Sequence, residues 1–176
     1  MKNIEGYVLP FDITKLKLRT NLIEFDGPLL SLYYSEGGDY YLFYWVDRDE
    51  RFNRWIILRV GINSLIRYLR QETTLYQIIT NSADNFVRVA DIDGKGEINM
   101  IKCITSDMLP SDYLPEEDSY FTFDHKQKLL DEVSMETYGI DIPKSDRNTF
   151  AIIASKMGWR FSTATIKDLL NKSAVL

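Results

Sequence analysis

The sequence predicts an α+β fold, with an antiparallel sheet of about five to six strands packed with helices and a helical C-terminal third. Aromatic residues, which favour strands and bury large areas, make up 13% of the chain. Short apolar runs separated by turn residues occupy its first part, and apolar residues at helical spacing occupy its last part. These observations together predict a sheet followed by helices.

Four strands form the clearest pattern. The apolar runs cover residues 22–25, 29–34, 40–47 and 54–60. Turn residues separate them, among them Asp26-Gly27-Pro28 and the run Glu36-Gly37-Gly38-Asp39, whose glycines tolerate the positive φ of a hairpin turn. Short connections join antiparallel neighbours, so this stretch predicts a meander.

The pairing of the second and third strands depends on their turn. If Gly37-Gly38 is a two-residue loop, Tyr34 faces Tyr41 and Leu32 faces Phe43. Both faces of the sheet are then apolar, and a slip by one residue would leave them so. We therefore expect the sheet to be covered on both faces, or covered on one face and used for binding on the other.

Two short helices and a second hairpin follow the meander. Asn63 and Thr74 are each placed to cap a short helix. Residues 86–92 and 97–105 predict a hairpin across Asp93-Gly94-Lys95-Gly96. Two prolines make residues 108–118 an irregular loop.

The last third carries helical patterns. Asp124 and Gln127 resemble a capping box for a helix whose inward residues include Leu129, Leu130 and Val133. Residues 150–157 follow helical spacing, and Ser162 or Thr163 is placed to cap a last helix. Without a linker to divide the chain, we expect a single domain over residues 1–176. Its sheet-rich core would span residues 22–121, with a helical tail at 122–176 packed on it.

Charge, cysteine content and apolar pattern argue against several classes of protein. The net charge is −5, and no dense run of Lys and Arg provides the basic face that binds nucleic acid. Cys103 is the one cysteine, so no internal disulfide forms. Residues 1–10 lack the apolar core of a signal peptide, and no apolar run is long enough to span a membrane. We expect a cytoplasmic protein with no membrane partner.

The parts of common catalytic sites are missing. With His125 as its one histidine and Cys103 as its one cysteine, the chain cannot assemble most Ser/His/Asp, Cys/His or zinc sites. Cys103 lies in an apolar strand, where a buried role is expected. The glycine-rich motifs that bind phosphate are also absent from the sequence. The sequence therefore predicts neither an enzyme nor a cofactor.

Two acidic segments suggest metal binding. Asp47, Asp49 and Glu50, with Asp26, could form a divalent-metal site, although acidic residues are also ordinary in a solvated turn. The segment Asp91-Ile92-Asp93-Gly94-Lys95-Gly96-Glu97-Ile98 resembles a calcium loop. An EF-hand, however, would need acidic ligands where Val89 and Met100 stand, so a hairpin turn is favoured.

A helix-turn-helix is weakly indicated near the end of the chain. Ala154 and Gly158 have the required spacing, and basic residues follow nearby. Ala164 occupies the place of the usual branched apolar residue, so an ordinary packed pair of helices is favoured. The basic residues that could contact phosphate are Lys156, Arg160 and Lys167.

The aromatic surface of the sheet is the remaining candidate site. Tyrosine and tryptophan are enriched at interface anchors because they bury large areas at little entropic cost. A two-sided core is the alternative explanation of such residues. The protein-binding hypothesis names Tyr33, Tyr44, Trp45 and Trp55.

Residues 22–121 resemble an uncharacterised bacterial domain family of unknown function. The likeness rests on Glu24-Phe25-Asp26-Gly27-Pro28-Leu29-Leu30, Gly38-Asp39-Tyr40-Tyr41-Leu42-Phe43-Tyr44-Trp45-Val46-Asp47, Arg54-Trp55-Ile56-Ile57-Leu58-Arg59-Val60 and Leu109-Pro110 with Tyr113-Leu114-Pro115-Glu116-Glu117. The resemblance implies a bacterial origin and a link to defence or toxin-related operons. It implies no activity.

Three functions remain open at this point. The first is a non-enzymatic protein-interaction domain, an accessory, antitoxin- or immunity-like component that binds a protein partner or itself. The second is a metal-dependent nuclease or hydrolase that uses the acidic cluster. The third is a DNA-binding regulator that acts through the C-terminal helices.

Overall fold

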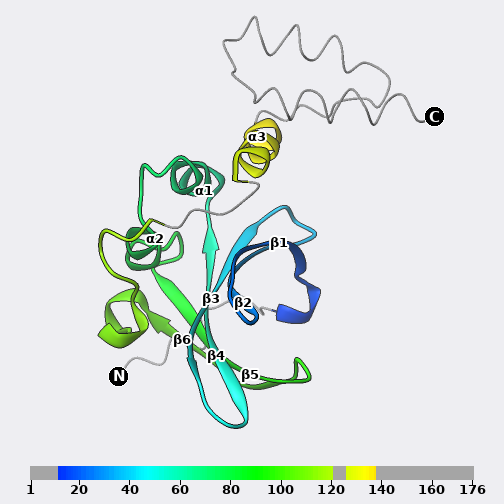
Figure 1. Cartoon of the computed structure of the whole chain (residues 1–176), viewed down its shortest axis with the longest axis vertical. Helices are drawn as coiled ribbons and strands as arrows, with labels where there is room; N and C mark the ends of the chain where they lie inside the picture. The colour runs from blue at the N-terminus through cyan, green and yellow to red at the C-terminus, as the bar shows by residue number, and fades with distance from the viewer. Residues whose placement is uncertain (1–11, 121–125, 138–176) are drawn as a thin grey trace, which may run out of the picture. The chain divides into compact units, whose positions relative to one another are not determined.

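A computed structural model of the chain describes residues 12–120 and 126–137 (Figure 1). The chain divides into two compact units, residues 1–123 and 124–176, and each unit is described by itself. The boundary lies close to residue 121, where the sequence predicts the end of the sheet-rich core. That residues 1–176 form one domain stays a prediction.

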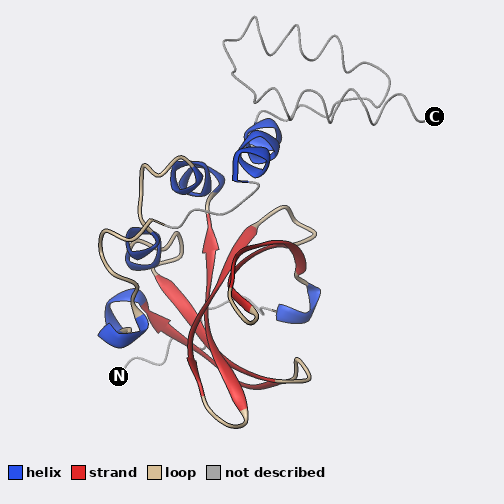
Figure 2. Ribbon diagram, in the orientation of Figure 1, coloured by secondary structure: helices blue, strands red, loops and turns tan. Residues whose placement is uncertain are grey.

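Six strands form one antiparallel sheet, whose spatial order is the chain order (Figure 2). The strands are β1 (Lys17–Glu24), β2 (Pro28–Tyr34), β3 (Tyr40–Arg48), β4 (Phe52–Val60), β5 (Phe86–Asp93) and β6 (Ile98–Thr105). The predicted meander and second hairpin are confirmed. The first strand begins well before Leu22, because polar residues of β1 also pair with β2.

The predicted register of β2 and β3 is wrong by one residue. Tyr34 pairs with Tyr40 and Leu32 with Leu42. The connecting loop spans five residues, 35–39, and is closed by a 2.9 Å hydrogen bond from the Ser35 N–H to the Asp39 carbonyl. The longer loop shifts the pairing, so Tyr41, Phe43 and Trp45 lie on the face opposite Leu30 and Leu32. A two-residue loop would have placed all five side chains on the same face.

The central strands are buried on both faces. Side chains on one face are completely buried, among them Leu30, Leu32, Leu42, Ile56 and Leu58. On the other face, a second core packs against Ile13 and Leu16, and it consists of Tyr41, Phe43, Ile57 and Ala90. Of the two alternatives that the sequence left open, burial on both faces holds for the middle of the sheet.

Short helices accompany the sheet in this unit (Figures 1 and 2). They are the helices α1 (Ile62–Leu69) and α2 (Leu75–Thr80) and the 3-10 turns η2 (Ile13–Lys15), η3 (Ser106–Met108) and η4 (Ser111–Tyr113). Thr74 caps α2 as predicted, and its hydroxyl accepts a 3.2 Å hydrogen bond from the Gln77 N–H. The predicted cap at Asn63 is wrong, because Gly61 is the N-cap of α1 and Asn63 already lies in its first turn.

In the second unit the structure describes α3 (Lys126–Thr137). Leu129 and Val133 are buried, as their spacing predicts, and Leu130 is half-buried. Asp124, the predicted cap, lies outside the described residues. The helices predicted at residues 150–157 and from Ser162 or Thr163 also lie outside them.

Candidate functional site

A row of apolar side chains crosses four strands on one face of the sheet. Trp45 on β3 pairs with Trp55 on β4, Trp55 with Ala90 on β5, and Ala90 with Ile101 on β6. Directly paired residues of antiparallel strands point to the same face, so the four side chains form one line. Ile92 and Ile98, which pair with each other, extend this line toward the β5–β6 turn. We call these six residues the apolar stripe.

The apolar stripe is most exposed at the edge of the sheet. Ala90 is completely buried, and Trp45 and Trp55 are half-buried. Ile98 and Ile101 on the edge strand are 36% and 41% exposed. The stripe therefore passes through the second core at Ala90 and ends on the molecular surface at β6.

A hydrogen bond satisfies the polar tip of one tryptophan. The indole N–H of Trp45 donates to the Oδ1 atom of Asn53, at 3.2 Å. Asn53 pairs with Ile92 across β4 and β5, which places it beside the stripe. The ring of Trp45 is thus oriented by a neighbour, and its apolar surface stays available for packing.

Two of the four predicted protein-binding residues belong to the stripe. Trp45 and Trp55 do so, whereas Tyr33 packs in the second core with its ring 4.2 Å from that of Phe43. Tyr44 is half-buried, and it lies on the opposite face of the sheet because it pairs with Leu30. The hypothesis missed Ile98 and Ile101. Their strand was recognised as apolar, but its place at the edge does not follow from a local pattern.

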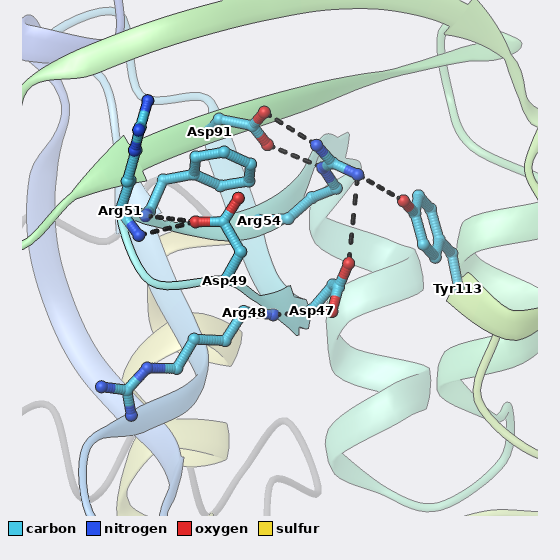
Figure 3. Close-up of polar contacts among 8 residues, drawn as sticks. Asp47, Arg48, Asp49, Arg51, Arg54, Asp91 and Tyr113 are labelled. Atoms are coloured by element: carbon cyan, nitrogen blue, oxygen red, sulfur yellow. Dashed lines mark hydrogen bonds and ion pairs between the residues drawn. The ribbon is translucent and has the colours of Figure 1, made fainter.

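A second constellation joins polar groups of four elements, β3, β4, β5 and η4 (Figure 3). The guanidinium of Arg54 donates hydrogen bonds of 2.7 and 2.8 Å to the two carboxylate oxygens of Asp91. It donates a third, of 2.7 Å, to the hydroxyl of Tyr113, and it lies 4.0 Å from the carboxylate of Asp47. The side chain of Asp91 is only 6% exposed.

The hydrogen bonds to Asp91, followed by the one to Tyr113, raise the pKa of Arg54 above its ordinary value. The guanidinium thus stays charged, and its partners satisfy most of its donors. The arrangement fastens the η4 segment to the sheet. It presents no nucleophile beside a base.

The acidic residues proposed for a metal site do not act together. Asp49 accepts hydrogen bonds from the backbone N–H groups of Arg51 and Phe52, at 2.6 and 3.0 Å, as turn residues do (Figure 3). Asp47 lies beside Arg54, and Asp26 occupies the separate β1–β2 turn, where its φ is 52°. Within residues 12–120 and 126–137, no group of three acidic, histidine or cysteine side chains could hold a metal ion.

The segment that resembles a calcium loop, residues 91–98, forms a hairpin turn, as the sequence favours. The carboxylate of Asp93 accepts hydrogen bonds from the backbone N–H groups of Lys95 and Glu97, at 2.8 and 2.9 Å. These bonds, that from Glu97 first, lower the pKa of Asp93. Gly96 supplies the positive φ of 85° that the turn needs.

A cavity of about 340 Å³ lies between the start of α1 and α2. Its most strongly bonded cation, Arg59, already forms ion pairs with Asp84 and with Asp39. Gln77 and Asn81 in its wall bond to groups of their own helix region. These polar groups in the cavity wall therefore bond within the protein, and they do not indicate a particular ligand.

The remaining candidates from the sequence are Cys103, His125 and the proposed DNA-binding segment. Cys103 is half-buried on β6 and pairs with Arg88. His125 and the proposed DNA-binding segment with Ala154 and Gly158 lie outside the described residues.

No helix in the described part of the chain has the length and apolar character needed to cross a bilayer.

Comparison with known proteins identifies a family. Residues 12–149 match the model of a family of unknown function, DUF6575. The match includes the whole segment 22–121 and extends beyond it on both sides. No curated protein and no solved structure matches the chain. Because the matched residues make up more than half of its length, the chain belongs to this family of unknown function.

Proposed function

We propose that this chain is a non-enzymatic protein-interaction domain that binds a protein through the apolar stripe and the adjoining strand β6. The observation that carries the proposal is the exposure of Ile98 and Ile101 at the end of a line of aromatic and aliphatic side chains. Scattered exposed apolar residues are ordinary, whereas contiguous ones are typical of contact surfaces.

The composition of the stripe supports this function. Tryptophans lose little conformational freedom on binding and are enriched among residues that dominate binding energy. Trp55 packs against the second core, so it would present a preformed surface.

The enzyme and DNA-binding alternatives have less support. Asp26 and Asp49 lie in two different turns and Asp47 lies near the end of β3, and the carboxylates of Asp47 and Asp49 are engaged by neighbouring groups. The DNA-binding alternative depends on residues beyond the described part of the chain. An accessory, antitoxin- or immunity-like role is a further proposal that rests on the resemblance to bacterial families alone.

Site-specific photo-crosslinking in the host cell tests the proposal. A photoreactive amino acid replaces Ile98 or Ile101, and the matched control replaces Leu18, which is 51% exposed on the opposite edge strand β1. We expect a defined protein adduct from positions 98 and 101 and none from position 18. Adducts at position 18 alone, or none at any position, would contradict the proposal.

A further inference from the structure

Among the residues that the structure describes, β1 and β6 form the two edges of the sheet, and they differ in how they discourage pairing with another strand. Strand β1 pairs irregularly with β2, with register shifts at three places. It also carries charged residues along its length, among them Lys17, Arg19 and Glu24. Irregular pairing and edge charges are the usual means by which proteins prevent edge-to-edge association.

Strand β6 has few of these features. Its eight residues, Ile98–Thr105, include one charged side chain, Lys102, and no proline. Its pairing with β5 has a single irregularity, near the start of the strand. A regular, apolar edge strand is suited to accept another strand through backbone hydrogen bonds.

A second copy of the same strand fits this edge. When two β6 strands pair antiparallel about a twofold axis at Ile101, Lys102 of each copy stands opposite Met100 of the other. A register centred on Lys102 would instead place two ammonium groups opposite each other, which is unfavourable. The charge pattern of the strand therefore favours the register centred on Ile101.

This register also joins the two apolar stripes. A twofold axis perpendicular to the sheet keeps the same face of both copies on the same side. The line Trp45–Trp55–Ala90–Ile101 of one copy then continues at Ile101 of the other. Pairing would cover the exposed parts of Ile98 and Ile101 and produce one surface twice as long.

We propose that the partner at β6 is a second copy of this chain, bound by antiparallel β6–β6 pairing centred on Ile101. The inference rests on the proposed interaction function and names its partner. A contact one strand long falls in the small class of interfaces, below roughly 1,200 Å². We therefore expect a reversible dimer with a dissociation constant on the order of tens of micromolar.

Sedimentation equilibrium of the full chain tests the proposal over a protein concentration range of about 1 to about 500 μM. The variant Ile101→Lys places two like charges face to face at the axis, and it should weaken dimerisation at least about tenfold. Leu18→Lys is the matched control, because Leu18 is an exposed aliphatic residue of the other edge. It should dimerise like the wild type.

A milder variant, Ile101→Thr, guards against a folding defect, since threonine keeps the strand preference but removes apolar area. It should weaken the dimer less than Ile101→Lys does. A wild type that stays monomeric over the whole range, or equal weakening by Leu18→Lys, overturns the proposal. If the chain is monomeric but position 98 crosslinks to another protein, the second-copy inference fails and the interaction function stands. If neither occurs, both fail.

Discussion

Arg54 and Asp91 are partners on neighbouring strands, and the carboxylate of Asp91 accepts two hydrogen bonds from the guanidinium of Arg54. They are 37 residues apart in the chain and stand directly opposite each other in the β4–β5 register. The pair lies on the face opposite the apolar stripe. It therefore stabilises the sheet that positions the stripe and does not contribute to the stripe's surface.

The variant Asp91→Asn should destabilise the protein by about 2 kcal/mol. Removing one partner of a buried ion pair costs roughly 3–5 kcal/mol, and the 23% exposure of Arg54 reduces that cost. The comparison variant is Asp47→Asn, whose carboxylate is 4.0 Å from Arg54 and 53% exposed, and which should change stability by less than about 0.5 kcal/mol. Urea unfolding of both variants checks this prediction, and equal losses would contradict it.

Tyr113→Phe should loosen the segment that contains η3 and η4. The substitution keeps the ring but removes the acceptor of a 2.7 Å hydrogen bond from Arg54, which is worth about 1.5–3 kcal/mol when the donor is charged. Limited proteolysis should show faster cleavage within residues 106–120, while the strands stay resistant. Unchanged cleavage in that segment would show that Tyr113 does not anchor it.

Tyr68→Phe should have the opposite effect on stability. Tyr68 on α1 is 4% exposed, and its hydroxyl is the one buried side-chain group without a hydrogen-bond partner in the described part of the chain. Removing an unsatisfied buried hydroxyl should stabilise the protein by roughly 1 kcal/mol. Thermal and urea unfolding measure the change, and a loss of stability would indicate a partner for the hydroxyl.

The same variant should alter stability at alkaline pH. Burial raises the pKa of Tyr68, and Tyr44 contributes in the same direction. In the unfolded chain a tyrosine loses its proton near pH 10, so above that pH the folded state binds more protons and stability falls as pH rises. Tyr68→Phe should therefore lose less stability than the wild type between about pH 10 and 11. Parallel pH profiles would contradict this.

Divalent cations should leave the melting temperature unchanged. Asp49 is engaged by backbone N–H groups and Asp47 lies beside Arg54, so neither carboxylate is arranged for a metal ion. Mg²⁺, Mn²⁺ or Ca²⁺ at about 5 mM should shift the melting temperature by less than about 1 °C. A saturable increase that Asp49→Asn abolishes would restore the metal-dependent alternative.

Local sequence patterns predicted most of the sheet. Alternating apolar residues and turn residues located all six strands, and the cap at Thr74 followed from its position before an apolar helical run. The register between β2 and β3 was missed because Gly37-Gly38 suggested a two-residue loop, and only Gly38 adopts a positive φ. A shift of one residue was enough to place Tyr41, Phe43 and Trp45 on the face opposite Leu30 and Leu32.

The site was harder to predict because it depends on strand order. Trp45 and Ile101 lie in strands that are not neighbours, and Arg54 and Tyr113 are 59 residues apart. No local pattern connects such residues. The sequence did indicate that Trp45 and Trp55 were candidates, since tyrosine and tryptophan are enriched at interface anchors.

Hydrogen exchange along β6 tests most directly whether this strand is the contact edge. Deuterium uptake by residues 98–105 of the full chain should fall as protein concentration rises from about 1 to about 500 μM, because pairing protects edge amides. Uptake by residues 17–24 on the opposite edge should not change. If uptake along β6 is independent of concentration, or if protection arises on β1 instead, this account of the edge is contradicted.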